Sequence, residues 1–218
     1  MLAIFDAEGV LVDGEFMPEL AKLIGKDNEV LDLTNQGKMG TINWEDGLYK
    51  RVDVLKGISY NNCLRVASEM PLMPGAVEAL RTLRNMGFTT ITVSGGPSLL
   101  VDRVKQELGI DYAFSNNLIF TDSKLSGIDI KVTSNKSKVL RDTINSLGVE
   151  RESIISTVDG ANDLTLFEIG GLGIAFNAQP IVEEKADVIV RERNLMNIIP
   201  IIREHFSSID NISTTSPK

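Results

Sequence analysis

Five short apolar runs, rich in β-branched residues, recur along the chain, and a polar residue follows each of them. The runs span residues 2–5, 89–93, 153–158, 172–176 and 187–190. Apolar runs this short, bounded by residues that favour turns, are typical of buried parallel strands. This feature limits the chain to folds that are built around a parallel sheet.

Amphipathic patterns with helical spacing occupy the chain between these strands. Apolar residues recur with this spacing over residues 76–83, 99–108 and 139–147, and a glycine follows each pattern. A glycine commonly ends a helix because it adopts left-handed backbone angles without strain. Strands that alternate with helices predict an α/β fold with a Rossmann-like, doubly wound parallel sheet as its core.

Residues 14–71 interrupt this alternation, because they contain helical patterns and no strand. We expect four helices there, at about 16–25, 28–38, 43–56 and 60–69. The insertion predicts a small helical cap domain, residues 14–71, on an α/β core formed by residues 1–13 and 72–205.

Two further segments depart from the alternating pattern. Residues 112–132 contain short apolar stretches separated by Asn116-Asn117 and Ser126-Gly127, which predicts a small antiparallel excursion. Residues 206–218 are rich in Ser, Thr and Asn, and this composition predicts a disordered tail.

Charge and cysteine content exclude several kinds of function. The chain of 218 residues has 30 acidic and 22 basic residues, a net charge of −8, which disfavours a nucleic-acid-binding surface. One cysteine, Cys63, excludes an internal disulfide and a multi-cysteine metal cluster. No apolar run reaches the ~18 residues that a membrane span needs, and no signal-type segment precedes residue 2. We expect a cytoplasmic protein without nucleic-acid or membrane partners.

Polar residues gather where the expected strands end or where the following helix begins. In an open parallel sheet, ligands bind at the carboxyl ends of the strands, and these ends share one edge. We therefore expect these side chains to form one site. In chain order they are Asp6, Glu8, Ser94, Gly95, Lys136, Asp159 and Asp163.

The chemistry of this group indicates phosphoryl transfer. Clustered acids repel each other unless a cation lies between them, and oxygen ligands without His or Cys favour Mg²⁺. The glycine turn at residues 94–98 offers backbone N–H groups to a phosphate, and Lys136 adds a positive charge. A carboxylate such as Asp6 is ionised at neutral pH and can attack phosphorus.

Four segments resemble the signature motifs of the haloacid dehalogenase superfamily. The segment Asp159-Gly160-Ala161-Asn162-Asp163 is the most specific of them. The order of the motifs and the helical insertion after the first resemble the phosphoserine phosphatase branch, and the similarity covers about residues 2–204. The four segments are residues 5–10, 93–96, 135–138 and 158–163.

This resemblance implies catalytic roles for the acids. Asp6 would be the nucleophile and a Mg²⁺ ligand, together with Asp159 and the backbone carbonyl of Glu8. The Glu8 carboxyl would be the general acid and base. Asp163 would support the waters of the metal or Lys136.

The resemblance also implies how the substrate binds. Ser94, Gly95 and Lys136 would hold the phosphoryl oxygens, with Lys136 preferred to its neighbour Lys138. Glu15 and Arg51, both in the insertion, would hold the amino and carboxylate groups of the substrate. The implied partner is a small phosphate ester of serine biosynthesis, and the protein would be a monomer or a homodimer.

Two positions depart from the family pattern. Glu8 stands where the family has Asp, and its longer side chain can protonate a leaving oxygen only if the site makes room. Lys38 stands where the branch tends to have an apolar Met. It either favours a more acidic substrate than phosphoserine or points to water. Trp44 is expected to pack against the cap or to take part in recognition.

Three functions remain open from the sequence. The first is a Mg²⁺-dependent phosphomonoester hydrolase with an aspartyl-phosphate intermediate, for which phosphoserine is the first substrate to consider. The second is a non-catalytic phosphoryl-acceptor or phospho-ligand-binding module on the same fold, which Glu8 in place of Asp keeps open. The third is a phosphotransferase that passes the phosphoryl group to an alcohol.

Overall fold

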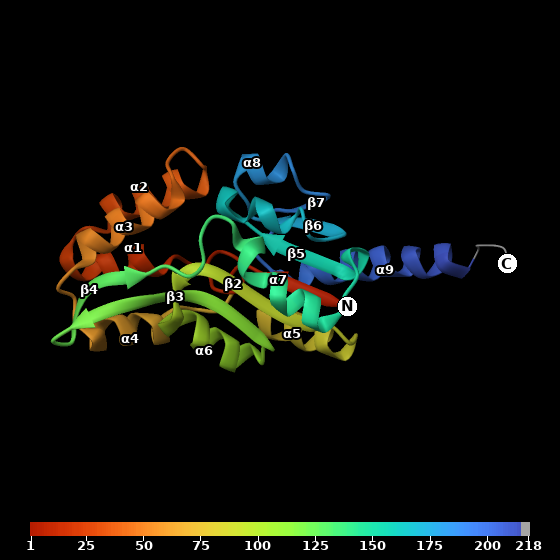
Figure 1. Ribbon diagram of the computed structural model, residues 1–218, viewed down its shortest axis with the longest axis horizontal. Helices are drawn as coiled ribbons and strands as arrows, with labels where there is room; N and C mark the ends of the chain where they lie inside the picture. Colours follow the sequence, from red (N-terminus) through yellow and green to blue (C-terminus); the bar gives the residue numbers. More distant parts are fainter. Residues whose placement is uncertain (215–218) are drawn as a thin grey trace.

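One sheet of seven strands organises the computed structural model, which describes residues 1–214, with side chains described for residues 1–207. The strand order is β4-β3-β2-β1-β5-β6-β7 (Figure 1). All neighbouring strands are parallel except β3 and β4. The strands are β1 (Leu2–Phe5), β2 (Thr89–Pro97), β3 (Tyr112–Thr121), β4 (Lys124–Asp129), β5 (Ile154–Val158), β6 (Leu172–Phe176) and β7 (Val188–Val190).

Helices cover both faces of this sheet. Successive side chains of a strand point to opposite faces, so Leu2 and Ile4 belong to one apolar cluster, whereas Ala3 and Phe5 belong to the other. Both clusters are fully buried at β1, which explains its uninterrupted apolar sequence. The predicted α/β, doubly wound fold is confirmed. The core helices are α5 (Ala76–Asn85), α6 (Ser98–Leu108), α7 (Lys136–Leu147), α8 (Pro180–Glu183) and α9 (Ile198–Thr214).

The insertion between β1 and α5 contains helices joined by short loops and no strand, and its helices lie close to the predicted positions. Side chains of Asn43 and Ser59 accept hydrogen bonds from the backbone N–H groups of Asp46 and Asn62, which stabilises the starts of α3 and α4. The elements are α1 (Phe16–Ala21), the 3₁₀ turn η1 (Lys22–Ile24), α2 (Asp27–Lys38), α3 (Trp44–Leu55) and α4 (Tyr60–Glu69).

The two chain segments that join the insertion to the sheet lie side by side. The backbone N–H of Asp13 donates to the carbonyl of Pro71, and the N–H of Met73 donates to that of Leu11, at 2.9 and 2.8 Å. The inserted helices therefore leave and rejoin the core at one place.

The second strand is longer than the sequence analysis expected. We expected the strand to end at Val93, but β2 continues to Pro97, with a shift of register after Val93. The side chain of Asn116 explains this extension, because its Nδ2 donates to the carbonyl of Gly95 at 2.9 Å. Asn116 lies on another strand, so no local pattern around residue 93 could reveal its contribution.

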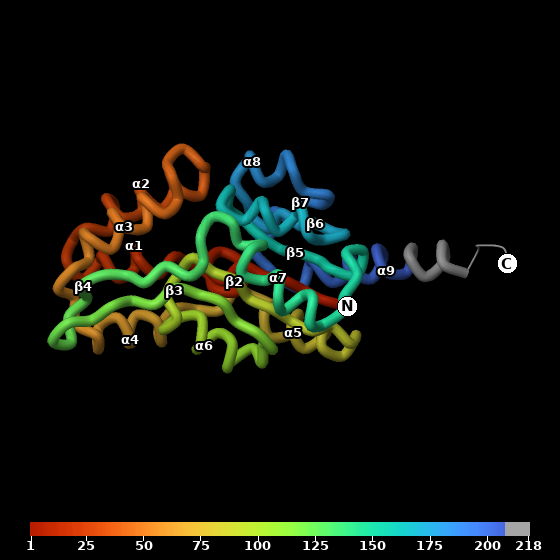
Figure 2. Tube along the Cα trace, viewed as in Figure 1, coloured from red at the N-terminus to blue at the C-terminus, as the bar shows by residue number. Residues whose placement is uncertain are grey.

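The expected antiparallel pairing is present, but it involves only part of residues 112–132. Residues 112–116 of β3 extend the parallel sheet beside β2, and residues 117–121 then pair with β4. The hairpin reaches the inserted helices, where the N–H of Gly57 donates to the carbonyl of Leu125 at 2.8 Å. Figure 2 shows the orange helices beside this green hairpin.

The C-terminal segment differs from its prediction. Helix α9 continues to Thr214, so residues 206–214 are helical rather than disordered. The remaining part of the predicted tail, residues 215–218, lies outside the described residues. Over residues 1–214, none of the helices combines the length and the apolar character that crossing a membrane requires.

Candidate active site

Three carboxylates meet at the carboxyl edge of the sheet. Asp6 follows β1, and Asp159 and Asp163 follow β5, its neighbour in the sheet. Their carboxylate oxygens lie within 4.8 Å of one another, and all three residues are buried. Adjacent parallel strands end at the same edge, which brings together residues about 150 positions apart.

Lys136 joins this cluster from the first turn of α7. Its Nζ donates to Asp6 Oδ1 at 2.8 Å and to the carbonyl of Val93 at 3.1 Å, and it forms an ion pair with Asp163. Burial lowers the pKa of Lys136, but the charges of Asp163 and Asp6 outweigh burial and raise it above its ordinary value. Lys138 is exposed, so Lys136 is the lysine that reaches the site.

The donor set fits a hard divalent cation. Asp159 Oδ1 and Asn162 Oδ1 are buried and have no hydrogen-bond partner within the described chain. Burial and the charge of Asp6 raise the pKa of Asp159 to about 8 and that of Asp163 to about 6, although Lys38 and Lys136 act in the opposite direction. Oxygen ligands of this kind are those that Mg²⁺ takes in proteins. The sequence analysis did not single out Asn162, although it lies within the most specific motif.

The longer side chain of Glu8 fits because two neighbouring features make room for it. Glu8 Oε1 accepts a hydrogen bond from the backbone N–H of Phe16 at 2.6 Å. Its Oε2 lies where a Cβ on Gly96 would stand, only 2.1 Å away, so a side chain at position 96 would displace it. Burial, followed by the charges of Glu15 and Asp6, raises the pKa of Glu8 to about 8. Glu8 is therefore protonated near neutral pH.

The carboxyl end of β2 lies beside Asp6, where the sequence predicted a glycine turn. Ser94 is buried, and its Oγ accepts a hydrogen bond from the N–H of Gly96 at 3.0 Å. Trp44 of α3 packs directly on this turn, because a Cβ on Gly95 would lie 2.5 Å from Trp44 Cζ2. Trp44 therefore lines the site, and its packing is not confined to the inserted helices.

Lys38 points into the site and not to water. Its Nζ lies 2.5 Å from Glu15 Oε1 and 2.5 Å from Asp159 Oδ2, and its side chain is 13% exposed. Burial lowers the pKa of Lys38, but the charges of Asp159 and Glu15 outweigh it and raise the pKa. Lys38 thus links the inserted helices to the sheet.

Arg51 also lies on the cap side of the site. Its Nε donates to the carbonyl of Gly47 at 3.2 Å, its Nη1 donates to Thr34 Oγ1 at 3.3 Å, and its guanidinium lies 4.7 Å from the Trp44 ring centroid. Its Nη2 is buried and has no hydrogen-bond partner among residues 1–207. Arg51 and Glu15 line one small cavity, together with Glu8, Met17, Pro18, Trp44, Leu48, Gly95 and Gly96.

A second contact between the inserted helices and the rest of the chain has no signal in the sequence. Glu45 Oε1 accepts hydrogen bonds from the backbone N–H and the hydroxyl of Ser134, at 2.8 and 3.0 Å. Burial raises the pKa of Glu45, but these hydrogen bonds outweigh it and lower the pKa. The two residues are 89 positions apart, and a lone Glu on a helix is most often solvated.

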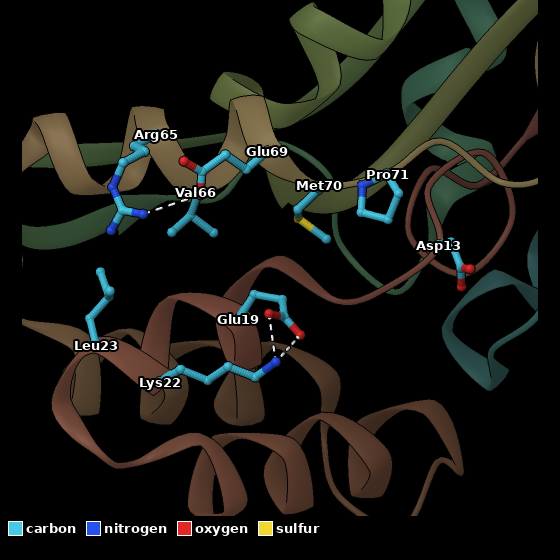
Figure 3. Close-up of a pocket in the computed structure, with 9 residues that line it drawn as sticks. All are labelled: Asp13, Glu19, Lys22, Leu23, Arg65, Val66, Glu69, Met70 and Pro71. Carbon is cyan, nitrogen blue, oxygen red and sulfur yellow. Dashed lines mark hydrogen bonds and ion pairs between the residues drawn. The ribbon is translucent and has the colours of Figure 1, made fainter.

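Two features of the sequence lie away from this site. Cys63 is buried in α4, where burial raises the pKa of its thiol to about 11. His205 lies on α9, where its ring makes an edge contact with Phe206. A groove of about 370 Å³ between α1 and α4 also lies apart (Figure 3). Within it Lys22 pairs with Glu19 and Arg65 with Glu69, and Asp13 at its edge pairs with Arg193.

Comparison with known proteins agrees with this geometry. The phosphoserine phosphatase of Methanocaldococcus jannaschii is 35% identical over 93% of this chain and 97% of its own length. That of Campylobacter jejuni subsp. doylei is 34% identical over 92% of this chain and 99% of its own length. A solved structure described as a phospho-aspartyl intermediate analogue of phosphoserine phosphatase has a TM-score of 0.89 and 35% identity, covering 92% of this chain and 97% of that one.

The family assignment rests on more than these relatives. The model of the haloacid dehalogenase-like hydrolase family matches residues 1–169, which include all four motifs. The match confirms the resemblance that the motifs indicated. This chain belongs to the haloacid dehalogenase-like hydrolase family, in its phosphoserine phosphatase-like branch.

Proposed function

We propose that this protein is a Mg²⁺-dependent phosphomonoester hydrolase that acts through an aspartyl phosphate on a small phosphorylated metabolite, with phosphoserine as the first candidate. One observation carries the proposal: Asp6 is held by Lys136 beside two further buried acids, at the edge of the sheet where ligands bind. The phosphoserine phosphatases to which the chain is similar support this choice of substrate.

The first step is the attack of Asp6 on phosphorus. Lys136 holds Asp6 Oδ1, which leaves Oδ2 to form the new bond to phosphorus. As the ester bond breaks, its electron pair passes to the leaving oxygen, and protonated Glu8 supplies the proton. The Ser94 hydroxyl, the Gly95 N–H and Lys136 would hold the phosphoryl oxygens.

The second step is hydrolysis of the aspartyl phosphate. Glu8, now a carboxylate, takes a proton from water while the water oxygen bonds to phosphorus. The bond from phosphorus to Asp6 breaks, which restores both carboxyl groups to their starting state and releases phosphate. Asp6, Asp159 and the Glu8 backbone carbonyl would hold Mg²⁺, with Asp163 in support. When bound, this ion would neutralise charge on the phosphoryl oxygens.

The cap, residues 14–71, would act as a lid over this chemistry. Lys38 reaches Asp159, and Glu45 reaches Ser134, so two polar links hold the cap against the core. A closed cap excludes water and strengthens the electrostatic contacts within the site. Arg51 and Glu15, on the cap wall of the cavity, would face the part of the substrate beyond its phosphate.

Turnover separates this proposal from the other two functions. With Mg²⁺ and phosphoserine, a hydrolase releases many phosphate molecules per protein molecule. A phosphoryl-acceptor module would instead stop at one phosphoryl group on Asp6, and stable labelling of that kind would refute the proposal. A phosphotransferase would pass the phosphoryl group to an added alcohol such as glycerol, at the expense of free phosphate.

We expect Glu8→Gln to lower the rate on phosphoserine by about 10²–10⁴-fold, the usual range for loss of a general acid or base. The wild-type rate should fall as the pH rises above about 8, because Glu8 must be protonated for the first step and burial raises its pKa to that value. Steady-state phosphate release over a range of pH measures both effects.

Glu8→Asp is the matched control for this prediction. It keeps a carboxyl group, so it should retain far more activity than Glu8→Gln. A Glu8→Gln variant as active as the wild type on phosphoserine would exclude Glu8 as the proton donor.

We expect Gly95→Ala to raise KM about tenfold, because the added methyl would lie 2.5 Å from Trp44 Cζ2 and would push the cap from the core. Overpacking of this kind typically costs about 1–3 kcal/mol. Emission from Trp44, the one tryptophan of the chain, should shift to the red at the same time. Gly127→Ala is the control, because its nearest neighbour would lie 3.8 Å away. Unchanged KM and emission in Gly95→Ala would show that the cap closes differently.

A further inference from the structure

The cap wall of the active-site cavity presents two donors without partners. Arg51 is 4% exposed, and its Nη2 has no hydrogen-bond partner among the described residues. The indole Nε1 of Trp44 is also buried and unpartnered. Both residues line the same cavity, next to Gly95. Buried donors of this kind are costly unless a ligand satisfies them, and a carboxylate offers the acceptors that they need.

The carboxylate on the same wall is already occupied. Glu15 would be the natural partner for an amino group of a substrate, but its Oε1 lies 2.5 Å from Lys38 Nζ. The same ammonium group lies 2.5 Å from Asp159 Oδ2, so it is held at two points. A substrate ammonium group would have to displace Lys38 or lie beside it, and two like charges in a shielded site repel each other.

The charges of this wall therefore favour an anion. The charge of Lys38 is balanced by Glu15 and Asp159, whereas Arg51 keeps one buried nitrogen, Nη2, without a hydrogen-bond partner among the described residues. Because these groups lie beyond the phosphate-binding turn, they act on the remainder of the substrate. A carboxylate gains from the unpartnered donors of Arg51 and Trp44, whereas an ammonium group gains nothing from a Glu15 that is already paired.

We propose that Lys38 determines specificity, and that the site accepts phosphate esters of hydroxy acids that carry no amino group at least as readily as phosphoserine. The proposal rests on the proposed function and names the class of substrate for it: a small ester with a carboxylate, for which an amino group is not required. Lys38 acts as an internal ammonium group in the place that an amino group of the substrate would take.

Two esters that differ at one group provide the test. In 3-phosphoglycerate, a hydroxyl replaces the amino group of phosphoserine at the same carbon. The measured quantity is the ratio of kcat/KM for phosphoserine to kcat/KM for 3-phosphoglycerate. Both esters use the same metal and phosphate contacts, so the ratio isolates the cap wall. In the wild type we expect a ratio of about 1 or lower, which means that the amino group brings no preference.

Lys38→Met should raise this ratio at least tenfold, because it frees Glu15 to bind the amino group. Lys38→Arg keeps the positive charge and should keep the wild-type ratio. Phosphoethanolamine, which has an amino group but no carboxylate, should be a poor substrate of the wild type. A ratio that stays constant or falls in Lys38→Met would overturn the proposal.

Glu15→Gln gives an independent answer if Lys38→Met does not fold. With Glu15 already paired to Lys38, its replacement should change the ratio by less than about threefold. A selective loss of activity on phosphoserine would show that Glu15 binds the amino group despite Lys38, which would contradict the proposal. The fluorescence emission of Trp44 measures the binding of each ester independently of its hydrolysis.

Failure of the proposed function gives a different result. If none of the three esters releases phosphate in the presence of Mg²⁺, the hydrolase assignment itself is wrong. If phosphate is released and only the ratios disagree, the hydrolase stands and Lys38 has no part in specificity.

Discussion

Asp6→Asn abolishes turnover, with an expected loss of at least about 10⁴-fold, as is usual when a nucleophile is removed. The amide cannot attack phosphorus as a carboxylate does. Phosphate release with Mg²⁺ measures the loss. Intact-protein mass spectrometry of acid-quenched wild-type enzyme should show one added phosphoryl group, and the variant should show none.

The variant should remain folded, which separates lost chemistry from lost structure. Lys136 keeps its ion pair with Asp163 and its hydrogen bond to the Val93 carbonyl when Asp6 loses its charge. Substrate should still quench or shift the emission of Trp44. Hydrolysis by Asp6→Asn at the wild-type rate would refute the aspartyl-phosphate mechanism.

Lys136→Met has the largest expected effect on stability. The change leaves Asp6 and Asp163 buried without their cation, and breaking a buried ion pair in this way typically costs about 3–5 kcal/mol. Chemical denaturation of the metal-free protein measures the free energy of unfolding. Activity should be lost as well, because Lys136 holds Asp6 and would contact the phosphoryl group.

The loss of stability in Lys136→Met should depend on pH. In the wild type, the pKa of Asp163 is already raised to about 6, and removing Lys136 raises it further. The folded protein then binds a proton that the unfolded chain, with a pKa of about 3.9 for Asp, has released. The penalty is complete above the folded pKa and shrinks as the pH falls toward the unfolded value. Lowering the pH from 8 to 5 should therefore recover part of the stability.

Lys138→Met is the matched control, because it removes the same charge from an exposed position two residues away. Substitutions of that kind usually change stability by less than about 0.5 kcal/mol. Equal effects of the two variants would mean that Lys136 is not the buried counter-ion of the site.

Local patterns in the sequence predicted the positions of strands and helices most accurately. Apolar runs and the turn residues after them placed β1 and β5, and with them Asp6 and Asp159. Helical periodicity also placed the four cap helices closely, since amphipathic spacing and capping residues such as Asn43 operate within a few positions. The predicted end of the second strand was wrong, because Asn116, a distant residue on β3, holds the backbone at the end of β2.

Short-range signals in the sequence were sufficient to place acids and glycines at the ends of neighbouring parallel strands and a lysine at the start of a helix. The contacts between distant residues could be learned only from the packed fold: Lys38 against Glu15 and Asp159, Glu8 beside Gly96, and Glu45 on Ser134. These contacts depend on how the cap packs on the core. Direction and burial of a side chain follow from that packing, and no spacing along the chain encodes them.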